Sequence, residues 1–419
     1  MDLGQLSAAI SRSSLRRTSS ALALLCALTM TATRSVQAQI YAVLHNFTGR
    51  ADGSALYDGV TMDQAGNLYG TTSGGGNGIG QSGNGTVFRL SPAGASWVLA
   101  VLYTFQGGHD GGTPQSGVVF GPDGALYGTT SAGGGNGCGG SGCGTVFRLT
   151  PPATPCVAVL CPWAETVLYR FQGGTDGATP AYGDIVFDQS GSIYGTTIYG
   201  GNGPGTVYRL SDSGGSWTEN VLYAFPGDEG YPFGGVVFNQ SGNLYGTTFG
   251  NDGGMGTVYE MSPSGSSWIY RTLYSFTNEG DGYQPTGGVT LDQQGNLYGT
   301  TTAGGPYGGG TIYELIPSQG NWTFTLLQGL QSYAIPWDSP TLDNEGNVYG
   351  TSAFTGGPGD VFKLTPSSGK WSFDILHTFA GSDGYLPFGN VIVDANGGVY
   401  GTTFSGGSGG GGVVWEITP

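Results

Sequence analysis

The stretch Leu68-Tyr69-Gly70-Thr71-Thr72 decides the fold, because the same element returns six more times along the chain. Successive copies lie 51 to 67 residues apart, and the two longest intervals contain Gly-rich and cysteine-bearing insertions. A period of about 50 residues that is rich in short β-forming runs is typical of the blades of a β-propeller. The copies are centred on Tyr69, Tyr127, Tyr194, Tyr245, Tyr298, Tyr349 and Tyr400.

Each copy lies inside a longer unit that predicts four strands, best seen in the fourth unit. Residues 235–238, 243–248, 256–261 and 268–276 are rich in β-branched and aromatic residues, and turn residues separate them. The apolar residues form runs rather than strict alternations, so we expect both faces of each small sheet to be covered. The sequence therefore predicts an all-β fold in which each blade is a meander of four antiparallel strands.

The two ends of the expected mature chain indicate how the blades form a ring. Residues 40–47 match the fourth strand of a unit, whereas residues 412–417 match the third strand of the last unit. The last unit lacks a fourth strand of its own, and the first residues supply one. A closed ring needs this permutation because it covers an edge strand, whereas an open solenoid does not. We predict a seven-bladed β-propeller closed by the N-terminal strand, with an open β-solenoid or a repeated sandwich as the alternatives.

A Gly stands inside the second strand of every unit, where it weakens an isolated strand. Its recurrence predicts that a large ring or another backbone lies very close to this position. The neighbours that we expect come from the third and fourth strands, and they include Phe88, Phe147, Tyr208, Trp97, Trp163 and Trp217.

The first 38 residues have the layout of a secretory signal peptide. Arginines at 12, 16 and 17 precede an apolar run over 21–30, and the segment ends in small residues. This run is shorter than the roughly 20 residues that a membrane-spanning helix needs. We expect cleavage after Ala38, a single propeller domain over 39–419, and a secreted or periplasmic location.

The charge of the chain excludes some classes of partner. There are 12 basic and 28 acidic residues, which gives a formal net charge of −16 at pH 7. A field of this sign repels phosphate backbones and anionic lipid, so we expect neither nucleic acid nor a membrane as a partner. We expect a monomer that binds an extracellular glycan or protein.

Four cysteines lie close together in the expected mature chain, at Cys138, Cys143, Cys156 and Cys161. In an exported protein we expect disulfides, and the spacing does not match the usual zinc knuckles. The first pair flanks the loop between the second and third strands of its blade, and the second pair lies in the next loop. These loops are about 20 Å apart, which is beyond the reach of a disulfide. We therefore predict the pairs Cys138–Cys143 and Cys156–Cys161.

The whole repeat can be written G-V-x-x-D-x-x-G-N-L-Y-G-T-T, followed by G-T-V-F-R-L-S-P and W-x-x-x-x-L-Y-x-F. It resembles the tandem repeat of the GloVer-type exported bacterial proteins over essentially all of 39–419. The D-x-x-G-N-L-Y segment is also distantly similar to NHL-type propeller repeats. The first resemblance implies an exported repeat protein, with no agreed activity. In the sixth repeat, residues 326–330 replace L-Y-x-F and residues 359–361 replace G-T-V, so we expect blade six to pack less regularly.

The loops that enter each unit contain the candidate binding residues. They share one face of a propeller with the loops between the second and third strands, and six of them carry an Asp near a Gly. These acids could bind calcium or accept hydrogen bonds from sugar hydroxyls, while simple turn formation and blade packing explain the same residues. The ligand-binding candidates are Asp52, Asp110, Asp176, Asp228, Asp281, Asp383, His109, Tyr231, Tyr283, Trp337 and Tyr385.

The sequence gives little support to catalysis. His45 and His377 replace a Tyr of the fourth strand, and His109 beside Asp110 is a weak signal for acid–base chemistry. No nucleophile, metalloprotease or phosphate-loop motif is present, and the Asp63-to-Asn67 segment predicts a turn rather than a calcium loop. We assign no catalytic residue, and we leave metal ligands open with calcium as the one candidate cofactor. The predicted function is a binding or scaffolding propeller, and the alternative is an extracellular calcium-dependent enzyme that acts on a polysaccharide or a lactone.

Overall fold

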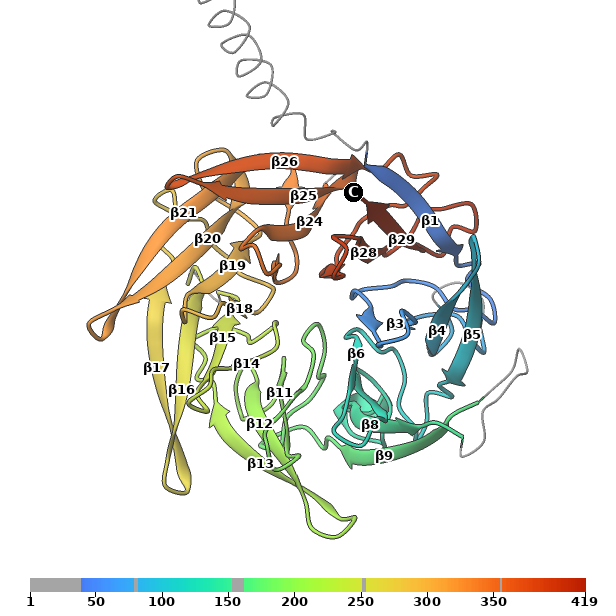
Figure 1. Ribbon diagram of the computed structural model, residues 1–419. Helices are drawn as coiled ribbons and strands as arrows, with labels where there is room; N and C mark the ends of the chain where they lie inside the picture. Colours follow the sequence, from blue (N-terminus) through green and yellow to red (C-terminus); the bar gives the residue numbers. More distant parts are fainter. Residues whose placement is uncertain (1–38, 79–81, 153–161, 251–253, 355) are drawn as a thin grey trace, which may run out of the picture. The chain divides into compact units, whose positions relative to one another are not determined.

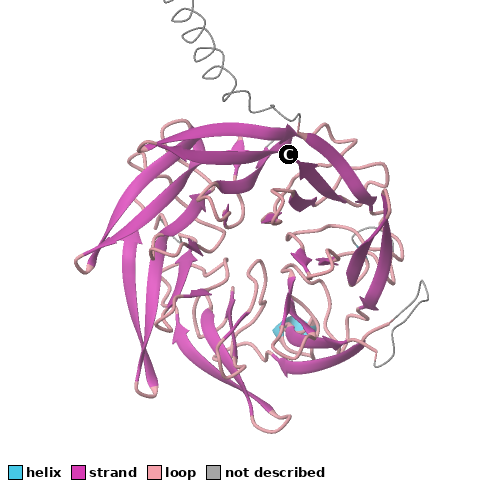
Figure 2. Cartoon of the chain, in the orientation of Figure 1, coloured by secondary structure: helices cyan, strands magenta, loops and turns pink. Residues whose placement is uncertain are grey.

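The computed structural model describes residues 39–78, 82–152, 162–250, 254–354 and 356–419. Within them, Tyr41–Thr418 form one compact unit, in which seven sheets surround a central axis (Figure 1). The described residues contain no α-helix, and Figure 2 shows a short 3-10 turn at Cys138–Gly140. Accordingly, no helix in these ranges is long and apolar enough to cross a membrane. The expected signal peptide lies outside the described residues.

Each sheet contains the four strands of one blade, named A to D from the axis outward. Blade 1 has β2 (Thr61–Met62), β3 (Leu68–Thr72), β4 (Thr86–Ala93) and β5 (Ser96–Thr104). Blade 2 has β6 (Val118–Phe120), β7 (Leu126–Thr130), β8 (Thr145–Thr150) and β9 (Ala164–Arg170). Blade 3 has β10 (Val186–Phe187), β11 (Ile193–Thr197), β12 (Thr206–Asp212) and β13 (Trp217–Ala224). Blade 4 has β14 (Val237–Phe238), β15 (Leu244–Thr248), β16 (Thr257–Ser264) and β17 (Ser267–Ser275).

The remaining blades follow the same plan with two variations. Blade 5 has β18 (Thr290–Leu291), β19 (Leu297–Thr301), β20 (Gly308–Ser318) and β21 (Asn321–Gln331). Blade 6 has β23 (Thr341–Leu342), β24 (Val348–Phe354), β25 (Gly357–Ser367) and β26 (Lys370–Thr378), and β22 (Ala334–Ile335) adds a fifth strand beside β24. Blade 7 has β27 (Ile392–Val393), β28 (Val399–Thr403), β29 (Val413–Thr418) and, as its outermost strand, β1 (Ile40–Asn46). The predicted seven-bladed, four-stranded propeller is confirmed.

Ring closure takes place inside blade 7, as the sequence predicted. The strand β1 lies beside β29, and the Phe47 N–H donates to the Gly412 carbonyl at 2.9 Å. The Gly411 N–H donates in return to the Phe47 carbonyl at 3.0 Å, so the two strands run antiparallel. The Tyr41 hydroxyl adds a 2.7 Å bond to the Asp383 carbonyl, which ties β1 to the end of blade 6 as well.

The innermost strands are shorter than the sequence predicted. In blade 4 the expected strand 235–238 is reduced to Val237–Phe238. The residues before it pack against the backbone of the next blade, since a Cβ on Gly234 would lie 2.2 Å from the Gly288 nitrogen. Close contact between blades therefore replaces strand pairing near the axis.

The Gly of each B strand lies under an aromatic ring of the neighbouring C strand. A Cβ on Gly70 would lie 2.7 Å from Phe88 Cζ, and one on Gly401 would lie 2.4 Å from Trp415. The predicted neighbours Phe88, Phe147 and Tyr208 are confirmed. The nearest atoms do not come from the expected fourth-strand residues Trp97, Trp163 and Trp217.

The first Thr of the repeated Gly-Thr-Thr links each blade to the next. Thr71 donates to the Ser116 carbonyl at 2.7 Å, and Thr247 donates to the Gly287 carbonyl at 2.7 Å. Thr402 of the last blade donates to the Asp58 carbonyl of the first, also at 2.7 Å. The recurring sequence therefore forms hydrogen bonds between blades around the axis.

The two loop types that were expected on one face pair with each other there. Isolated bridges join the D-to-A loops to the B-to-C loops, as between Ser54 and Gly74 or Tyr385 and Ser405. In blade 6 this contact extends into β22, which pairs with β24. One assignment was wrong, because residues 326–330 lie in β21 and belong to blade 5.

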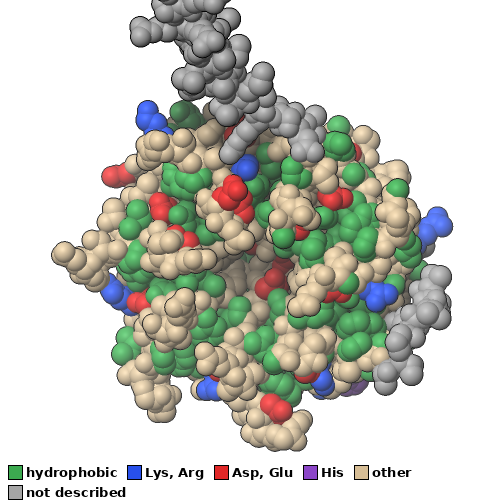
Figure 3. Space-filling model, viewed as in Figure 1, with side chains coloured by type: hydrophobic (Ala, Val, Ile, Leu, Met, Phe, Trp, Pro, Cys, Tyr) green, Lys and Arg blue, Asp and Glu red, His purple; other side chains and the backbone are tan. Residues whose placement is uncertain are grey.

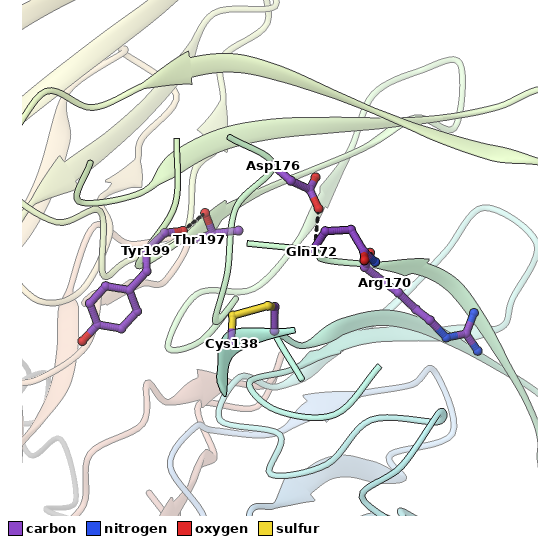
Figure 4. Close-up of a disulfide and its surroundings, with 7 residues drawn as sticks. Cys138, Arg170, Gln172, Asp176, Thr197 and Tyr199 are labelled. Atoms are coloured by element: carbon purple, nitrogen blue, oxygen red, sulfur yellow. Dashed lines mark hydrogen bonds between the residues drawn. A yellow bond between two sulfur atoms is a disulfide. The ribbon is translucent and has the colours of Figure 1, made fainter. Parts of the chain in front are cut away.

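A disulfide joins Cys138 to Cys143 in the B-to-C loop of blade 2, with Cα atoms 5.3 Å apart (Figure 4). This confirms the first predicted pair. The second predicted pair, Cys156 with Cys161, lies outside the described residues.

Candidate functional site

The Asp residues that the sequence singled out act as hydrogen-bond acceptors within their own turns. Asp110 accepts the Tyr103 hydroxyl at 3.0 Å and the Gln106 N–H at 2.8 Å. Asp281 makes the same pair of bonds with Tyr274 and Thr277. Figure 4 shows Asp176 directed toward Gln172 in the same way. Related bonds hold Asp52, through Thr48 and Arg50, and Asp383, through His377 and Ala380.

These acids lie near the start of six of the seven D-to-A loops, next to the outermost strands, and they do not meet at the axis. The loop from blade 3 to blade 4 departs from the expected pattern, because Glu229 rather than Asp228 accepts the hydroxyl of Tyr223 in β13, at 2.8 Å. Asp228 and His109 are exposed. The His109 carbonyl accepts a bond from Arg170 of the next blade at 3.2 Å.

The four candidate aromatic residues occupy different places on the same face. Tyr283 and Tyr385 pair through their backbones with Ala303 and Ser405 of the neighbouring loops. The ring of Tyr231 lies 5.8 Å from Tyr199 and 6.1 Å from Phe233. Only Trp337 lies in the group of rings at the axis.

Five blades each contribute an aromatic ring to this group, which we call the axial aromatic cluster. Trp337 lies 6.1 Å from Tyr182 and 5.4 Å from Phe388, measured between ring centroids. Tyr57 lies 5.6 Å from Tyr182, which connects blades 1 and 3 across the ring. All of its members are half-buried. The cluster consists of Tyr57, Tyr182, Phe233, Trp337 and Phe388, each about four residues before the start of an A strand.

Carboxyl groups line a cavity of about 160 Å³ directly beyond these rings. Asp58 and Asp338 follow Tyr57 and Trp337 in sequence, and Asp184 lies two residues after Tyr182. Asn390 and Ser339 also line this axial cavity. Figure 3 shows acidic side chains inside the central hollow of the ring. No Lys, Arg or His is among the described residues of the lining.

Backbone N–H groups of adjacent blades hold two of the three carboxyls. Asp58 accepts from Gly59 at 2.6 Å and from Gly117 of blade 2 at 2.8 Å. Asp338 accepts from Ser339 at 2.6 Å and from Asn390 of blade 7 at 3.2 Å. The third differs, because Asp184 Oδ1 has less than 1 Å² of exposed surface and accepts no hydrogen bond from the described residues.

Burial is the main cause of the unusual protonation of these groups. It raises the pKa of Asp58, and the backbone hydrogen bonds from Gly59 and Gly117 partly oppose that rise. Burial, followed by repulsion from Asp58, raises the pKa of Asp184 and of Asp338 well above the usual range. A carboxyl group with a raised pKa keeps its proton to a higher pH. The axial cavity therefore retains protons that exposed carboxyls would lose.

Sequence reasoning missed the three axial acids and two rings of the aromatic cluster, Tyr57 and Tyr182. The signal of the acids in the sequence is faint. It consists of an Asp where other units carry a Gly, just before strand A. In blades 4 and 5 both positions are Gly, at 234–235 and 287–288, whereas Asp appears at 58, 184 and 338. An internal alignment of the seven units at this position would have found them.

Among the described residues, no group of three or more His, Cys, Asp or Glu is arranged to hold a metal ion. Rings from five blades and a polar cavity beyond them form a site that could hold a small or extended polar ligand.

A sequence model of the Gloeobacter/Verrucomicrobia repeat matches residues 29–231 and 186–415 of the chain. The chain belongs to this repeat family. The two matched ranges cover nearly all of the seven repeats, which agrees with the resemblance to the GloVer-type repeat. No curated protein matches the sequence of this Gloeobacter/Verrucomicrobia repeat chain.

Several solved structures resemble this repeat chain in fold. A fungal alcohol oxidase solved in complex with copper has a TM-score of 0.53 at 12% identity, over 91% of this chain and 77% of that one. A putative 6-phosphogluconolactonase from Bacteroides uniformis has a TM-score of 0.47 at 17% identity, over 75% and 82%. A protein of unknown function from Dyadobacter fermentans has a TM-score of 0.46 at 12% identity, over 91% and 99%. At these identities the likeness concerns the fold alone.

Proposed function

We propose that this protein is an exported binding module that holds an extracellular glycan on its loop-rich face, at the axial aromatic cluster. The observation that carries the proposal is the gathering of five half-buried rings from five blades at one place. Aromatic rings offer flat apolar surfaces on which sugar rings stack, while tyrosine hydroxyls supply hydrogen bonds. Residues so far apart in sequence converge here only because the ring is closed.

The polar groups beside the cluster favour a sugar over a purely apolar molecule as the ligand. Gln115 donates to the Tyr182 hydroxyl at 3.2 Å, and Tyr57 and Tyr182 bring two phenol groups to the same place. Burial raises the pKa of Tyr182 to about 12, so its hydroxyl stays protonated and able to donate at neutral pH. A protein partner on this face is the second form of the proposal, and the same variants test it.

The enzymatic alternative has less support. The acids that it would use, such as Asp110 and Asp281, already accept two hydrogen bonds each in their turns. Their geometry is explained by loop formation without any ligand.

The test is a glycan array probed with residues 39–419, followed by calorimetry on the glycans that bind. Replacing Trp337 by Ala should weaken binding about tenfold or more, because a central aromatic contact contributes over 1.4 kcal/mol. The control is Tyr333→Ala, since Tyr333 is 67% exposed and lies outside the cluster. Equal affinity of Trp337→Ala and the wild type for every bound glycan would rule out this site.

Export is a separate part of the proposal and has its own test. Expression of the full chain in a bacterial host should give a periplasmic or secreted product whose first residue is Gln39. A cytoplasmic product that retains residues 1–38 would contradict it.

A further inference from the structure

The described lining of the axial cavity is acidic and contains no cationic side chain, which is the composition expected of a cation-binding site. Three carboxyls from blades 1, 3 and 6, namely Asp58, Asp184 and Asp338, share its lining with the amide of Asn390. Asp58 and Asp184 lie close together, because the Gly117 N–H bonds to Asp58 at 2.8 Å and a Cβ on Gly117 would lie 3.0 Å from Asp184 Oδ1. A lining with several carboxyl groups favours a bound group that donates hydrogen bonds.

Asp184 is the residue that points to an absent partner. Asp58 and Asp338 each accept two backbone hydrogen bonds, and those bonds account for their positions. Asp184 Oδ1 is shielded from solvent and accepts none from the described residues. The nearby Gly117 N–H bonds to Asp58 at 2.8 Å, and it only partly opposes the rise in the pKa of Asp184. A buried carboxyl oxygen without a donor is unfavourable, so the native state favours an external donor there.

The surroundings match an ammonium group. A primary ammonium carries one positive charge and three N–H donors, which suits several carboxyl and amide oxygens around one point. Tyr182 lines the same cavity, and aromatic rings attract organic cations. The volume of about 160 Å³ accommodates such a group together with a few waters.

We propose that the axial cavity binds a primary ammonium group, held by Asp184 and flanked by Asp58, Asp338 and the ring of Tyr182. The site shares Tyr182 with the axial aromatic cluster but depends on the carboxyl groups beyond it, so the proposal does not require that the ligand of the cluster is a glycan. Binding exchanges a proton for an organic cation. The ammonium enters with its three N–H protons, and the proton that the raised pKa keeps on Asp184 leaves to the buffer as that carboxyl ionises.

The experiment is calorimetric titration of residues 39–419 with methylammonium chloride at pH 7 and constant ionic strength. Titrations in phosphate and in MOPS should give different heats, because the two buffers take up the released proton with different enthalpies. Tetramethylammonium, which has the charge but no N–H donor, should bind at least about tenfold more weakly. D-glucosamine and Nα-acetyl-lysine then distinguish an amino sugar from a lysine side chain as the source of the group.

The matched variants are Asp184→Asn and Asp374→Asn. Both remove one carboxylate, but Asp374 is exposed on the outermost strand β26. Asp184→Asn should weaken methylammonium binding about tenfold or more while it keeps the melting temperature, and Asp374→Asn should change neither. Thermal melts of both variants show whether the fold is retained.

Three results would overturn the proposal. The first is that the wild type shows no saturable binding of methylammonium. The second is that folded Asp184→Asn binds methylammonium as tightly as the wild type does. The third is that the protein binds calcium tightly and methylammonium does not compete with it. The glycan proposal is judged separately by Trp337→Ala, so either proposal can fail while the other stands.

Discussion

Gly246 shows how one missing side chain allows a blade to pack. Its place in β15 lies under Tyr259 of β16, and a Cβ there would approach the Tyr259 hydroxyl to 2.5 Å. We expect Gly246→Ala to lower the free energy of unfolding by about 1–3 kcal/mol, because the fully buried ring has no room to withdraw. Urea denaturation measures this change.

The matched control is Gly108→Ala, because a Cβ on Gly108 meets no atom within 4 Å. That variant should unfold at the wild-type urea concentration. Equal stability of the two alanine variants would show that ring contact does not explain the Gly in strand B.

At the scale of single residues, the repeated features were predictable and the unique ones were not. Gly70 beneath Phe88 follows from a residue that recurs in every unit where a strand disfavours it. Asp58, Asp184 and Asp338 occur in only three units and at different offsets, so repetition gave no signal for them. Their meeting depends on ring geometry, which places the starts of all A strands at one axis.

Outer strands of neighbouring blades carry carboxyl groups that are partly buried, and this burial opposes their ionisation. Burial, with repulsion from Asp110, raises the pKa of Glu165 in β9 to about 7, and burial with repulsion from Asp176 does the same for Glu219 in β13. Each faces an acid in the preceding D-to-A loop. The candidate acids of the sequence therefore affect protonation between blades, beyond their turns.

This arrangement predicts a falling stability as the pH rises. A carboxyl whose pKa is raised in the folded chain keeps a proton that the unfolded chain releases from its ordinary value of 4.5 upward. The unfolded state therefore binds fewer protons between about pH 4.5 and 7, and the free energy of unfolding falls through that window. We expect Glu219→Gln to reduce the loss of stability between pH 5 and pH 8, as measured by urea denaturation at several pH values.

The exposed Glu279→Gln variant is the control, and we expect it to retain the wild-type pH dependence. If Glu219→Gln lost as much stability as the wild type between pH 5 and pH 8, the assignment of this effect to Glu219 would be incorrect.

Strand identity was predictable for B because its Leu-Tyr-Gly-Thr-Thr motif recurs in every unit, and for C and D because each is rich in β-branched and aromatic residues. Strand A was predicted too long, as with Val237–Phe238, since its sequence reads as a strand while its first residues pack against the next blade. Local sequence cannot distinguish a residue that pairs within its own sheet from one that contacts a neighbouring sheet.

The whole ring depends on β1, although that strand is only seven residues long. Removing residues 1–47 would delete the fully buried Phe47 and expose the edge of β29. Each large apolar side chain that loses its burial costs roughly 1.5–3 kcal/mol, against a total stability of about 5–15 kcal/mol. We expect this truncated protein to melt at a markedly lower temperature or to self-associate through the open edge.

Circular dichroism melts and light scattering would test this, with residues 39–419 as the reference. Adding a synthetic peptide of residues 39–47 should restore part of the lost stability by pairing with β29. A truncated protein that stayed monomeric with an unchanged melting temperature would show that closure by β1 contributes little.

The position of this closure also determines how the molecule yields to a mechanical load. In blades 1 to 6 the chain runs directly from the third strand to the fourth, but in blade 7 no such connection joins β29 to β1, and the seam between them is held by non-covalent contacts. Because the two strands run antiparallel, Ile40 and Thr418 lie at the same end of the seam. A force that pulls these two ends apart would break the hydrogen bonds between β1 and β29 one after another. The ring would therefore open at blade 7 at low force.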